Sequence, residues 1–520
     1  MRLHRHCIWI LVFISVLGVS CLVEPAEPGS MKEALSFGFL PSTEKVGPGD
    51  SISSVHEFSV SLAGNEYEGL QLILQSRKTG EIELECTPFF NEDGQLLESR
   101  LYMGKYIRCI SDRNYGTYPD ALIPLDSKEI SLEKGMNLPI YISLHAASGQ
   151  RCGTYRATLK ATDPKEVCEL FTAEITAHVW NFSLPETPSC RTAFGIHTPS
   201  IFAWYDPSVA VEVYGRYVDY LLNHKITPHW MNATILSGEG SEKMSDSRRT
   251  SFIIPYNGDD SDEAQFAKVS SSPEWLGKSF FYVVDEPSSE NDFAQLDAIS
   301  SRLSDICPGY HMITPFNTSE VTIGGKRRSV IDLLEGKSDI LCPISSLFSS
   351  SDFRSRIDRA ESEGSRIWWY VCSSPGGRYC NFLINQEALR PRILFWQQKA
   401  LGIEGMLYWE TSYWAETSNP WTDPLTTPST GNTSFGDGSL FYPGEDGPVA
   451  SLRLEAITDG IEDYEYLTMA EELFGRDYVD DIIARVTTGL TTYTLDSQLF
   501  EQVRKELGDS IEAEIGGMQT

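Results

Sequence analysis

Two adjacent carboxylates, Asp285 and Glu286, are the side chains of this 520-residue sequence with the clearest chemical potential. They follow the apolar run Phe280–Val284, which predicts a buried strand, and Pro287 ends that strand because it lacks a backbone donor. Two carboxylates in contact repel each other, so we expect the pKa of one to rise. A carboxyl group that keeps its proton near neutral pH can act as a general acid and protonate a leaving-group oxygen.

Other interpretations of the pair stay open. Neighbouring residues on a regular strand point to opposite faces, so both carboxylates reach one pocket only if the chain twists at the strand end. Alternatively, Asp285 caps the helix that follows and Glu286 is solvated. Glu410, which ends a later predicted strand, is an alternative second carboxylate, with Glu286 as acid/base and Glu410 as nucleophile or base. A separation of about 5 Å would suit the nucleophile, and about 6.5–9.5 Å the base.

The elements that must position these acids repeat along residues 189–475. Apolar runs there alternate with several helical patterns, which predicts a (β/α)8 barrel of the TIM type as the catalytic domain. The predicted strands are Thr192–His197, Ile226–Trp230, Phe252–Tyr256, Phe280–Val284, His311–Phe316, Ile340–Ile344, Arg366–Cys372 and Gly405–Glu410. The predicted helices include Val209–Asn223, Asp292–Cys307 and Glu387–Leu401, whereas residues 236–278 show little helical pattern. Barrel enzymes carry their chemistry at the C-terminal ends of the strands, where the Asp-Glu pair lies.

Aromatic side chains follow the last two predicted strands and could stack on the apolar faces of sugar rings. The candidate substrate-binding residues are Tyr370, Tyr408, Trp409, Trp414 and the polar Asn317, which could bond a hydroxyl or an acetamide. The alternative is that the rings belong to the barrel core, which we favour for Trp368, and that Asn317 only turns the chain. The loop 411–447 is longer than ordinary connections, which indicates a functional role.

The sequence before residue 189 has a different period. Residues 155–162 alternate strictly between apolar and polar, which predicts strands with one buried face and an antiparallel β-sandwich over residues 51–188. Residues 22–50 are rich in Pro, Gly and Ser and predict a tether, and residues 476–520 predict a C-terminal helical tail. We therefore expect a multidomain α and β protein.

The N-terminus has the pattern of an export signal over residues 1–21. Basic residues precede the apolar run Ile8–Leu17, and small residues then lead to Cys21. The segment Leu17–Cys21 resembles a bacterial lipoprotein processing site, which leaves open a lipid anchor at Cys21 or simple cleavage. We expect an exported protein that is periplasmic, an outer-membrane lipoprotein or extracellular. The formal charge of −31 argues against nucleic acid as a partner.

Neither a metal nor an organic cofactor is implied by the sequence. The cysteines and histidines lack metal-ligand spacing, and no phosphate-binding loop, dinucleotide fingerprint or nucleophile elbow is present. Export permits disulfides, and Cys372 with Cys380, on either side of a Pro-Gly-Gly turn, is the expected local pair. The segment Gly436–Gly438 predicts a tight turn in which Asp437 braces Arg453. The oligomeric state is not determined by any of these patterns.

Segments along nearly the whole mature chain resemble glycoside hydrolase family 123 in the same order. They are Asn65–Glu68 with Gln71, Phe281–Pro287, Trp369–Tyr370, Arg392–Trp396, Gly405–Trp409, Gly436–Gly444, Ser451–Glu455 and Asp459–Glu465. The resemblance implies a β-N-acetylgalactosaminidase-like enzyme that acts by substrate assistance and retains the anomeric configuration. It assigns Glu286 to protonate the glycosidic oxygen and later activate water, and Asp285 to orient the acetamido group that attacks the anomeric carbon.

Together these patterns predict a glycosidase of the β-N-acetylhexosaminidase type whose partner is a glycan substrate. We expect it to remove β-linked N-acetylgalactosamine or a related 2-acetamido sugar. A non-catalytic glycan-binding surface lipoprotein is the alternative, although binding alone does not require two crowded carboxylates. A structural surface protein is a third class, against which the aromatic loop argues.

Overall fold

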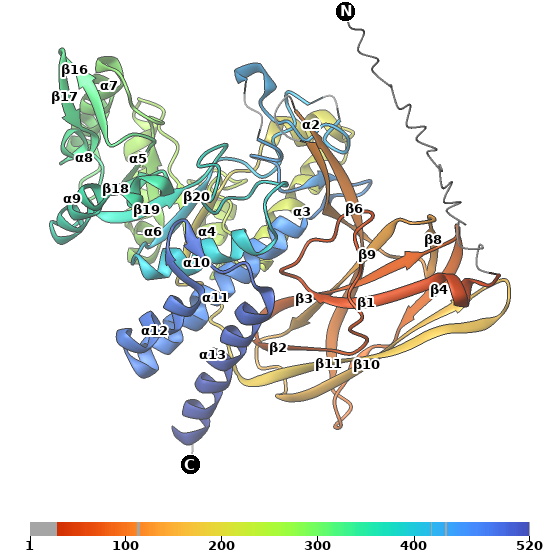
Figure 1. Ribbon diagram of the computed structural model, residues 1–520. Coiled ribbons are helices and arrows are strands. Elements are labelled where there is room, and N and C mark those ends of the chain that lie inside the picture. The colour runs from red at the N-terminus through yellow and green to blue at the C-terminus, as the bar shows by residue number, and fades with distance from the viewer. Residues whose placement is uncertain (1–28, 112–114, 418, 432–433, 519–520) are drawn as a thin grey trace, which may run out of the picture.

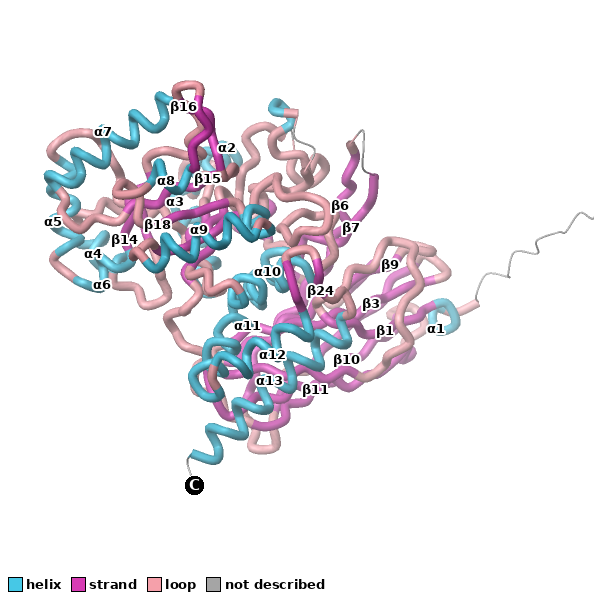
Figure 2. Tube along the Cα trace, turned by 60° about the vertical axis from the view of Figure 1, so that its left-hand side comes forward, coloured by secondary structure: helices cyan, strands magenta, loops and turns pink. Residues whose placement is uncertain are grey.

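Two β-sheets organise the protein, a large N-terminal sheet and a parallel barrel-like sheet, with helices around the second (Figure 1, Figure 2). The computed structural model describes residues 29–111, 115–417, 419–431 and 434–518. The predicted signal peptide and Cys21 lie outside these residues. Across the described ranges, no helix is both long enough and apolar enough to span a bilayer.

The N-terminal sheet contains eleven strands, and neighbours pair antiparallel except β2 and β11, which are parallel. The strands are β1 Leu35–Pro41, β2 Phe58–Gly64, β3 Glu66–Ser76, β4 Gly80–Cys86, β5 Phe89–Phe90, β6 Leu96–Ile110, β7 Tyr115–Pro124, β8 Glu129–Leu132, β9 Asn137–Ala146, β10 Gly153–Asp163 and β11 Cys168–Ser183. The predicted alternation is present on β10, where Tyr155, Ala157, Leu159 and Ala161 are buried and the residues between them are not. This strand therefore covers the core with one face.

Strand β6 joins the two halves of the N-terminal domain into one continuous strand order. Strand β6 is long enough to pair with β5 at its start, with β9 along its middle and with β7 at its end, and so joins both halves. Buried side chains of both halves, among them Leu72, Ile142, Leu159 and Ile175, form one hydrophobic cluster. The predicted tether is also part of this domain, because β1 pairs with β3 and a short helix, α1 (Met31–Ala34), precedes it.

The second sheet contains seven parallel strands in the order β12-β20-β19-β18-β15-β14-β13. They are β12 Arg191–Phe194, β13 Phe252–Ile253, β14 Ser279–Tyr282, β15 Met312–Phe316, β18 Ile340–Pro343, β19 Arg366–Tyr370 and β20 Gly405–Tyr408. The one predicted strand that is missing from this sheet is Ile226–Trp230. It makes only an isolated bridge from Pro228 to Phe194. Proline lacks a ladder donor, which explains the irregular pairing.

Residues 227–229 nevertheless close the ring of strands. The Phe194 nitrogen on β12 donates to the Thr227 carbonyl, and the Ile253 nitrogen on β13 donates to the His229 carbonyl. The two edge strands of the sheet are thus joined through one extended segment, as in a TIM-type barrel. Alternate residues of the strands fill the interior, including Phe280, Ile313 and Trp368. Trp368 is fully buried, which confirms its expected core position.

Helices surround the barrel and form the C-terminal part of the chain. They are α2 Thr198–Trp204, α3 Ala210–Asn223, α4 Gly238–Met244, α5 Ser261–Ser270, α6 Pro273–Lys278, α7 Glu290–Ile306, α8 Val330–Leu334, α9 Ser351–Ser362, α10 Leu389–Ala400, α11 Leu452–Phe474, α12 Arg476–Val486 and α13 Ser497–Met518. A hairpin of β16 (Glu320–Ile323) and β17 (Lys326–Ser329) follows β15, and a second, of β23 (Thr487–Gly489) and β24 (Thr492–Tyr493), interrupts the predicted helical tail. Residues 236–278 contain α4, α5 and α6, which are short and escaped the sequence prediction.

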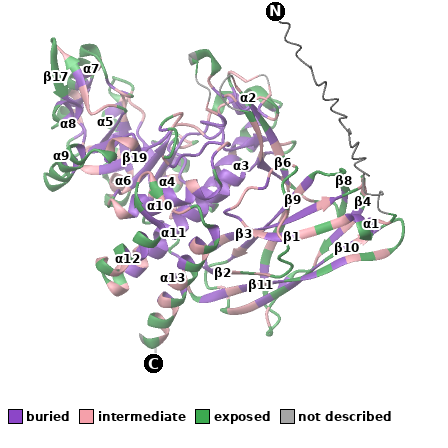
Figure 3. Ribbon diagram, viewed as in Figure 1, coloured by how far each residue is buried: buried purple, intermediate pink, exposed green. Residues whose placement is uncertain are grey.

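Helix α11 connects the two sheets and is buried on nearly every side (Figure 3). Its Asp459 and Asp463 accept from Arg392 on α10, which also contacts Glu68 on β3. Arg504 on α13 bonds Asp463 and forms a close ion pair with Glu66. Buried charges are tolerated when they are paired in this way. The resemblance segment that contains Glu66 and Glu68 therefore joins the N-terminal sheet to the barrel.

Candidate active site

The Asp285–Glu286 pair lies in a turn directly beyond β14. Glu286 has a φ of 46°, a left-handed conformation that costs a non-glycine residue about 1–2 kcal/mol. Its backbone nitrogen donates to the Pro315 carbonyl on the neighbouring strand at 3.2 Å, which anchors the turn. Because the turn breaks the alternation of the strand, both acids can face the mouth of the barrel. Strain of this kind is typical of functional sites.

Each carboxylate is held by a tyrosine that projects from the barrel interior. The Tyr282 hydroxyl donates to Asp285 Oδ1 at 2.8 Å, and the Tyr370 hydroxyl makes a short hydrogen bond to Glu286 Oε1. Asn317 Nδ2 donates to Glu286 Oε2 at 2.6 Å. The structure thus brings together four predicted site residues, Asp285, Glu286, Tyr370 and Asn317. The alternative in which Asp285 caps the next helix is wrong, because Ser289 and Asp292 form the capping box of α7.

Burial keeps the two tyrosines in their donating form. The pKa of Tyr370 is raised well above its ordinary value, first by burial and then by the hydrogen bond to Glu286. The pKa of Tyr282 is raised by burial and by the nearby Asp285 carboxylate. Both hydroxyls therefore stay protonated at any physiological pH. Each one fixes the position of a carboxylate oxygen without competing for its role in proton transfer.

A second part of the mouth is built around Trp409, which follows β20 and remains partly exposed. Its indole Nε1 donates to Asp437 Oδ1 at 2.9 Å, and its ring lies 5.0 Å from that of Tyr413. A Cβ at Gly438 would approach the Trp409 ring to 2.1 Å, so only glycine fits there. Burial raises the pKa of Asp437 to about 6. Asp437 is thus the residue that orients Trp409.

The expected contact between Asp437 and Arg453 is wrong. Arg453 pairs with Asp120 on β7 at 2.9 Å and donates to the carbonyls of Gly436 and Ser439. The arginine therefore braces the backbone of the turn, which frees the Asp437 carboxylate to bond Trp409. The N-terminal sheet thus contributes to the architecture of the site, through this ion pair and through the hydrogen bond from the Tyr442 hydroxyl to Asp120.

Two predicted sugar-binding residues lie in the core. Trp414 is buried, and its indole nitrogen donates to the Ser439 hydroxyl and to the Phe441 carbonyl. Tyr408 is fully buried, because it points away from the barrel interior into the packing of the surrounding helices. Both side chains position the 411–447 loop, and neither presents a face to a ligand.

Glu410 occupies a hollow at the same end of the barrel. Its Oε2 atom is buried and has no hydrogen-bond partner among the described residues. A Cβ at Gly195, just beyond β12, would lie 2.7 Å from Oε2, so the glycine leaves the room that this carboxyl occupies. Burial raises the pKa of Glu410 to about 8. The group is therefore mainly protonated at neutral pH.

Comparison with known proteins identifies the barrel. Residues 264–470 match the family described as "Glycoside hydrolase 123, catalytic domain". The chain carries a family 123 glycoside hydrolase domain. The matched segment contains every predicted site residue, from Asp285 to Trp414. It also contains Asp437. No curated protein sequence matches the chain.

One solved structure shares the fold of the chain over most of its length. A family 123 glycoside hydrolase from Clostridium perfringens, studied for glycolipid glycan hydrolysis, superposes with a TM-score of 0.68 at 13% identity and covers 93% of this chain and 98% of that one. An FMN-binding β-glucuronidase from Facaelibacterium prausnitzii L2-6 scores 0.32 at 9% identity, covering 82% and 61%. Bacteroides uniformis β-glucuronidase 2 scores 0.27 at 12% identity, covering 74% and 48%. Only the first likeness is close enough to support the shared fold over both sheets.

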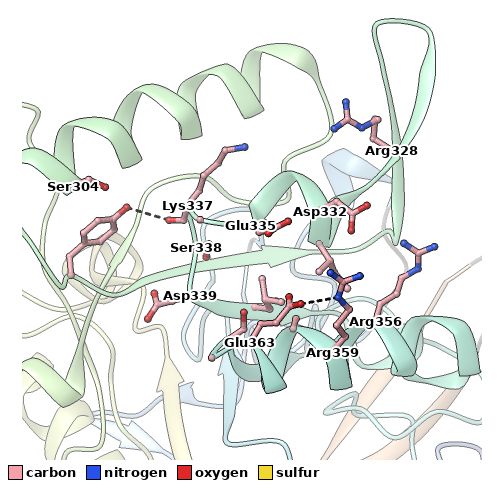
Figure 4. A pocket seen from close by; sticks show the side chains of 17 residues that line it. Ser304, Arg328, Asp332, Glu335, Lys337, Ser338, Asp339, Arg356, Arg359 and Glu363 are labelled. Atoms are coloured by element: carbon pink, nitrogen blue, oxygen red, sulfur yellow. Dashed lines mark hydrogen bonds and ion pairs between the residues drawn. The ribbon is translucent and has the colours of Figure 1, made fainter.

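A cavity lies away from this site, on the flank of the family 123 domain (Figure 4). It measures about 910 Å³ and is lined from α7, α8 and α9 and from the segments that enter β18 and β19. Those segments mark the N-terminal ends of the strands, whereas Asp285 and Glu286 follow a C-terminal end. Acids and bases alternate on its walls, such as Glu363 and Arg359, which bond each other. The cavity is therefore separate from the carboxylate pair.

Sequence reasoning missed Tyr282 and the bond between Asp437 and Trp409, and it predicted a disulfide that does not form. Tyr282 sits at an inward position of the strand before Asp285, and that period-two position could have indicated it. Asp437 lies far along the chain and gave no signal for its contact with Trp409. All nine cysteines in the described ranges are free, so the Cys372–Cys380 pair is wrong. Among the described residues, no cluster of three or more His, Cys, Asp or Glu side chains could hold a metal.

Proposed function

We propose that the protein is a glycosidase of the β-N-acetylhexosaminidase type that removes β-linked N-acetylgalactosamine, or a related 2-acetamido sugar, from glycans. The observation that carries the proposal is the turn at Glu286, which directs two adjacent carboxylates to the mouth of a family 123 barrel. Adjacent carboxylates are too close together to stand on either side of a sugar, as the usual pair of glycosidase acids does. A substrate group must then supply the nucleophile, and the 2-acetamido oxygen has the reach to do so.

In the first step, Glu286 donates its proton to the glycosidic oxygen while the acetamido oxygen attacks the anomeric carbon. The bond from that carbon to the leaving group breaks and an oxazolinium ring forms. Asp285 accepts a hydrogen bond from the acetamido N–H and stabilises the positive charge of the ring. Water then attacks the anomeric carbon, Glu286 takes a proton from this water, and the ring opens. Two successive inversions give retention of configuration.

The hydrogen bonds at the site support these two roles. Tyr370 and Asn317 each donate to one oxygen of Glu286, which holds the carboxyl group in a single orientation. Tyr282 donates to one oxygen of Asp285 and leaves the other for the substrate. Fixed donors and acceptors need no rearrangement during the reaction, which is a main source of catalytic rate. Trp409, which follows β20 at the same end of the barrel, provides an aromatic face for the sugar ring.

A mechanism with Glu410 as the second carboxylate is the alternative. Its raised pKa of about 8 weakens this alternative, because a nucleophile or general base must be ionised when the substrate binds. The substrate-assisted reaction requires no such group. It is therefore the mechanism that we favour.

Release of p-nitrophenol from the β-N-acetylgalactosaminide and the β-N-acetylglucosaminide tests the proposal. We expect turnover by the wild-type protein, loss of about 10²–10⁴-fold in Glu286→Gln, and a substantial loss in Asp285→Asn. Glu445→Gln, an exposed acid on the 411–447 loop, is the matched control and should keep full activity. Sugar binding without turnover by the wild-type protein would instead support the glycan-binding lipoprotein.

We also propose that the protein is exported and that its N-terminus is processed at Cys21. This rests on the sequence of residues 1–21, with its basic start, apolar run and small residues. Mass spectrometry of the mature protein would distinguish a diacylated Cys21 from a simple cleaved end. A mature protein that retains residue 1 would contradict export.

A further inference from the structure

The buried carboxyl of Glu410 has no role in the proposed reaction. Leaving a buried polar atom without a partner is costly, and such groups in folded proteins usually await a ligand or a bound water. Glu410 Oε2 is such an atom, since it is shut off from solvent and makes no hydrogen bond among the described residues. The residue as a whole remains partly exposed, and Oε1 is not among the buried atoms without a partner, so a ligand at the mouth of the barrel can reach the carboxyl group through Oε1.

The position of Glu410 in the ring of strands decides which part of a substrate it would meet. The eight ring positions run β12, β20, β19, β18, β15, β14, β13 and the segment 227–229, so β20 and β14 are four positions apart. Glu410 follows β20 and therefore lies across the mouth from Glu286, which follows β14. In a pyranose ring, C4 lies across the ring from the anomeric carbon. A sugar whose anomeric oxygen faces Glu286 thus directs its C4 hydroxyl toward the β20 side.

The groups around Glu410 are suited to a sugar ring. Burial raises the pKa of Tyr413, Glu416 adds to this effect, and Glu410 makes the smallest contribution. The Tyr413 ring contacts Trp409 on one side and His197 at 4.7 Å on the other. A row of three aromatic rings thus lies at the same end of the barrel as the Glu410 carboxyl, which can both donate and accept a hydrogen bond while it is protonated. An aromatic wall with one polar group is the usual composition of a sugar subsite.

We propose that Glu410 is a specificity residue that hydrogen-bonds the C4 hydroxyl of the 2-acetamido sugar, and that it thereby distinguishes the galacto from the gluco epimer. The inference rests on the proposed function and adds the residue that selects the sugar. Epimers at C4 place this hydroxyl on different faces of the ring, so one fixed carboxyl group pairs with only one of them. A polar site that is left unpaired by the wrong sugar discriminates strongly against it.

A cycle of protein and substrate changes tests the inference. The kcat/KM values of the wild-type protein, Glu410→Ala and Glu410→Gln are measured on the p-nitrophenyl β-N-acetylgalactosaminide, its C4 epimer and its 4-deoxy analogue, with Glu445→Gln as the control. In the wild-type protein, we expect the 4-deoxy analogue to react about tenfold or more slowly than the parent. Glu410→Ala should slow the parent to the level of the analogue and leave the analogue itself unchanged, while Glu410→Gln keeps part of the preference.

Equal losses on the parent and the 4-deoxy analogue in Glu410→Ala would overturn the inference, since they would show a merely structural role. Unchanged rates on both substrates would overturn it as well. Calorimetric binding of free N-acetylgalactosamine and its 4-deoxy form separates this inference from the proposed function. Binding that loses its preference for the C4 hydroxyl in Glu410→Ala supports the inference even when the wild-type protein turns over no substrate. Absence of binding by either sugar overturns both.

Discussion

Replacement of Gly438 by alanine tests whether the orientation of Trp409 matters for activity. The new Cβ would lie 2.1 Å from Trp409 Cζ2, whereas ordinary contact begins at 3.4 Å, so the indole must move by about 1.3 Å. That movement breaks the 2.9 Å hydrogen bond from Trp409 to Asp437. Displacement of a binding group by about 1 Å can lower the rate of an enzyme about a hundredfold. We therefore expect kcat/KM on the p-nitrophenyl substrate to fall by about 10–100-fold in Gly438→Ala.

Gly402→Ala separates this effect from backbone strain. Gly438 has a φ of 70° and Gly402 one of 67°, but a Cβ at Gly402 meets no atom within 4 Å. Both variants should lose about 1–2 kcal/mol of unfolding free energy in urea from backbone strain, because alanine tolerates this conformation poorly, and Gly438→Ala should lose more because of the clash with Trp409. Only Gly438→Ala should lose activity. Equal activity of the two folded variants would refute the role that we assign to Trp409.

Three further changes test the site and its support. Tyr370→Phe removes the hydroxyl that holds Glu286, and we expect kcat/KM to fall about tenfold with an unchanged melting temperature. Unchanged kinetics would show that this bond does not position the acid. Arg392→Met leaves the buried Asp459 without its arginine partner and leaves Glu68 and Asp463 with Arg504 alone, so it should cost about 3–5 kcal/mol in urea unfolding. Arg359→Met removes only a solvent-exposed ion pair and should leave the urea unfolding curve nearly unchanged. Similar losses of stability in the two variants would contradict the importance of burial. Burial raises the pKa of Glu455 from 4.5 to about 7, so the stability contributed by its neutral form is complete below pH 4.5 and lost as pH rises through 7. Glu455→Gln should therefore flatten the decline in stability between pH 5 and 8, and superimposable pH profiles would disprove this.

Much of the barrel could be predicted from the sequence because its strands are short apolar runs between helical patterns. Seven of the eight predicted strands are present, with ends that differ by a few residues. The exception contains Pro228, whose missing donor disrupts a ladder that hydrophobicity alone would predict. The N-terminal strands were also predictable from their alternation. Their joining into one sheet was not, since it depends on the length of β6 and its three pairing partners.

Site residues could be predicted from the sequence only where they lie next to each other in one segment of the chain. The Asp-Glu pair could be predicted because it follows its strand directly. That both acids face the mouth of the barrel depends on the positive φ of Glu286, which no side-chain pattern reveals. Trp409 and Trp414 lie five residues apart after β20. Trp414 is buried in the core, whereas Trp409 remains partly exposed at the mouth of the barrel. The expected disulfide failed for a similar reason. Cys372 packs against the barrel interior, and Cys380 belongs to the outer core.

The most direct test of the central claim is a rate series on substrates whose 2-acetamido group carries zero to three fluorine atoms. Fluorine withdraws electrons and makes the amide oxygen a poorer nucleophile without altering the leaving group. If this oxygen attacks the anomeric carbon while Glu286 donates its proton, kcat/KM will fall steeply with each fluorine. If an enzyme carboxylate such as Glu410 is the nucleophile, the series will be nearly flat, and the mechanism proposed for the Asp285–Glu286 pair will be contradicted.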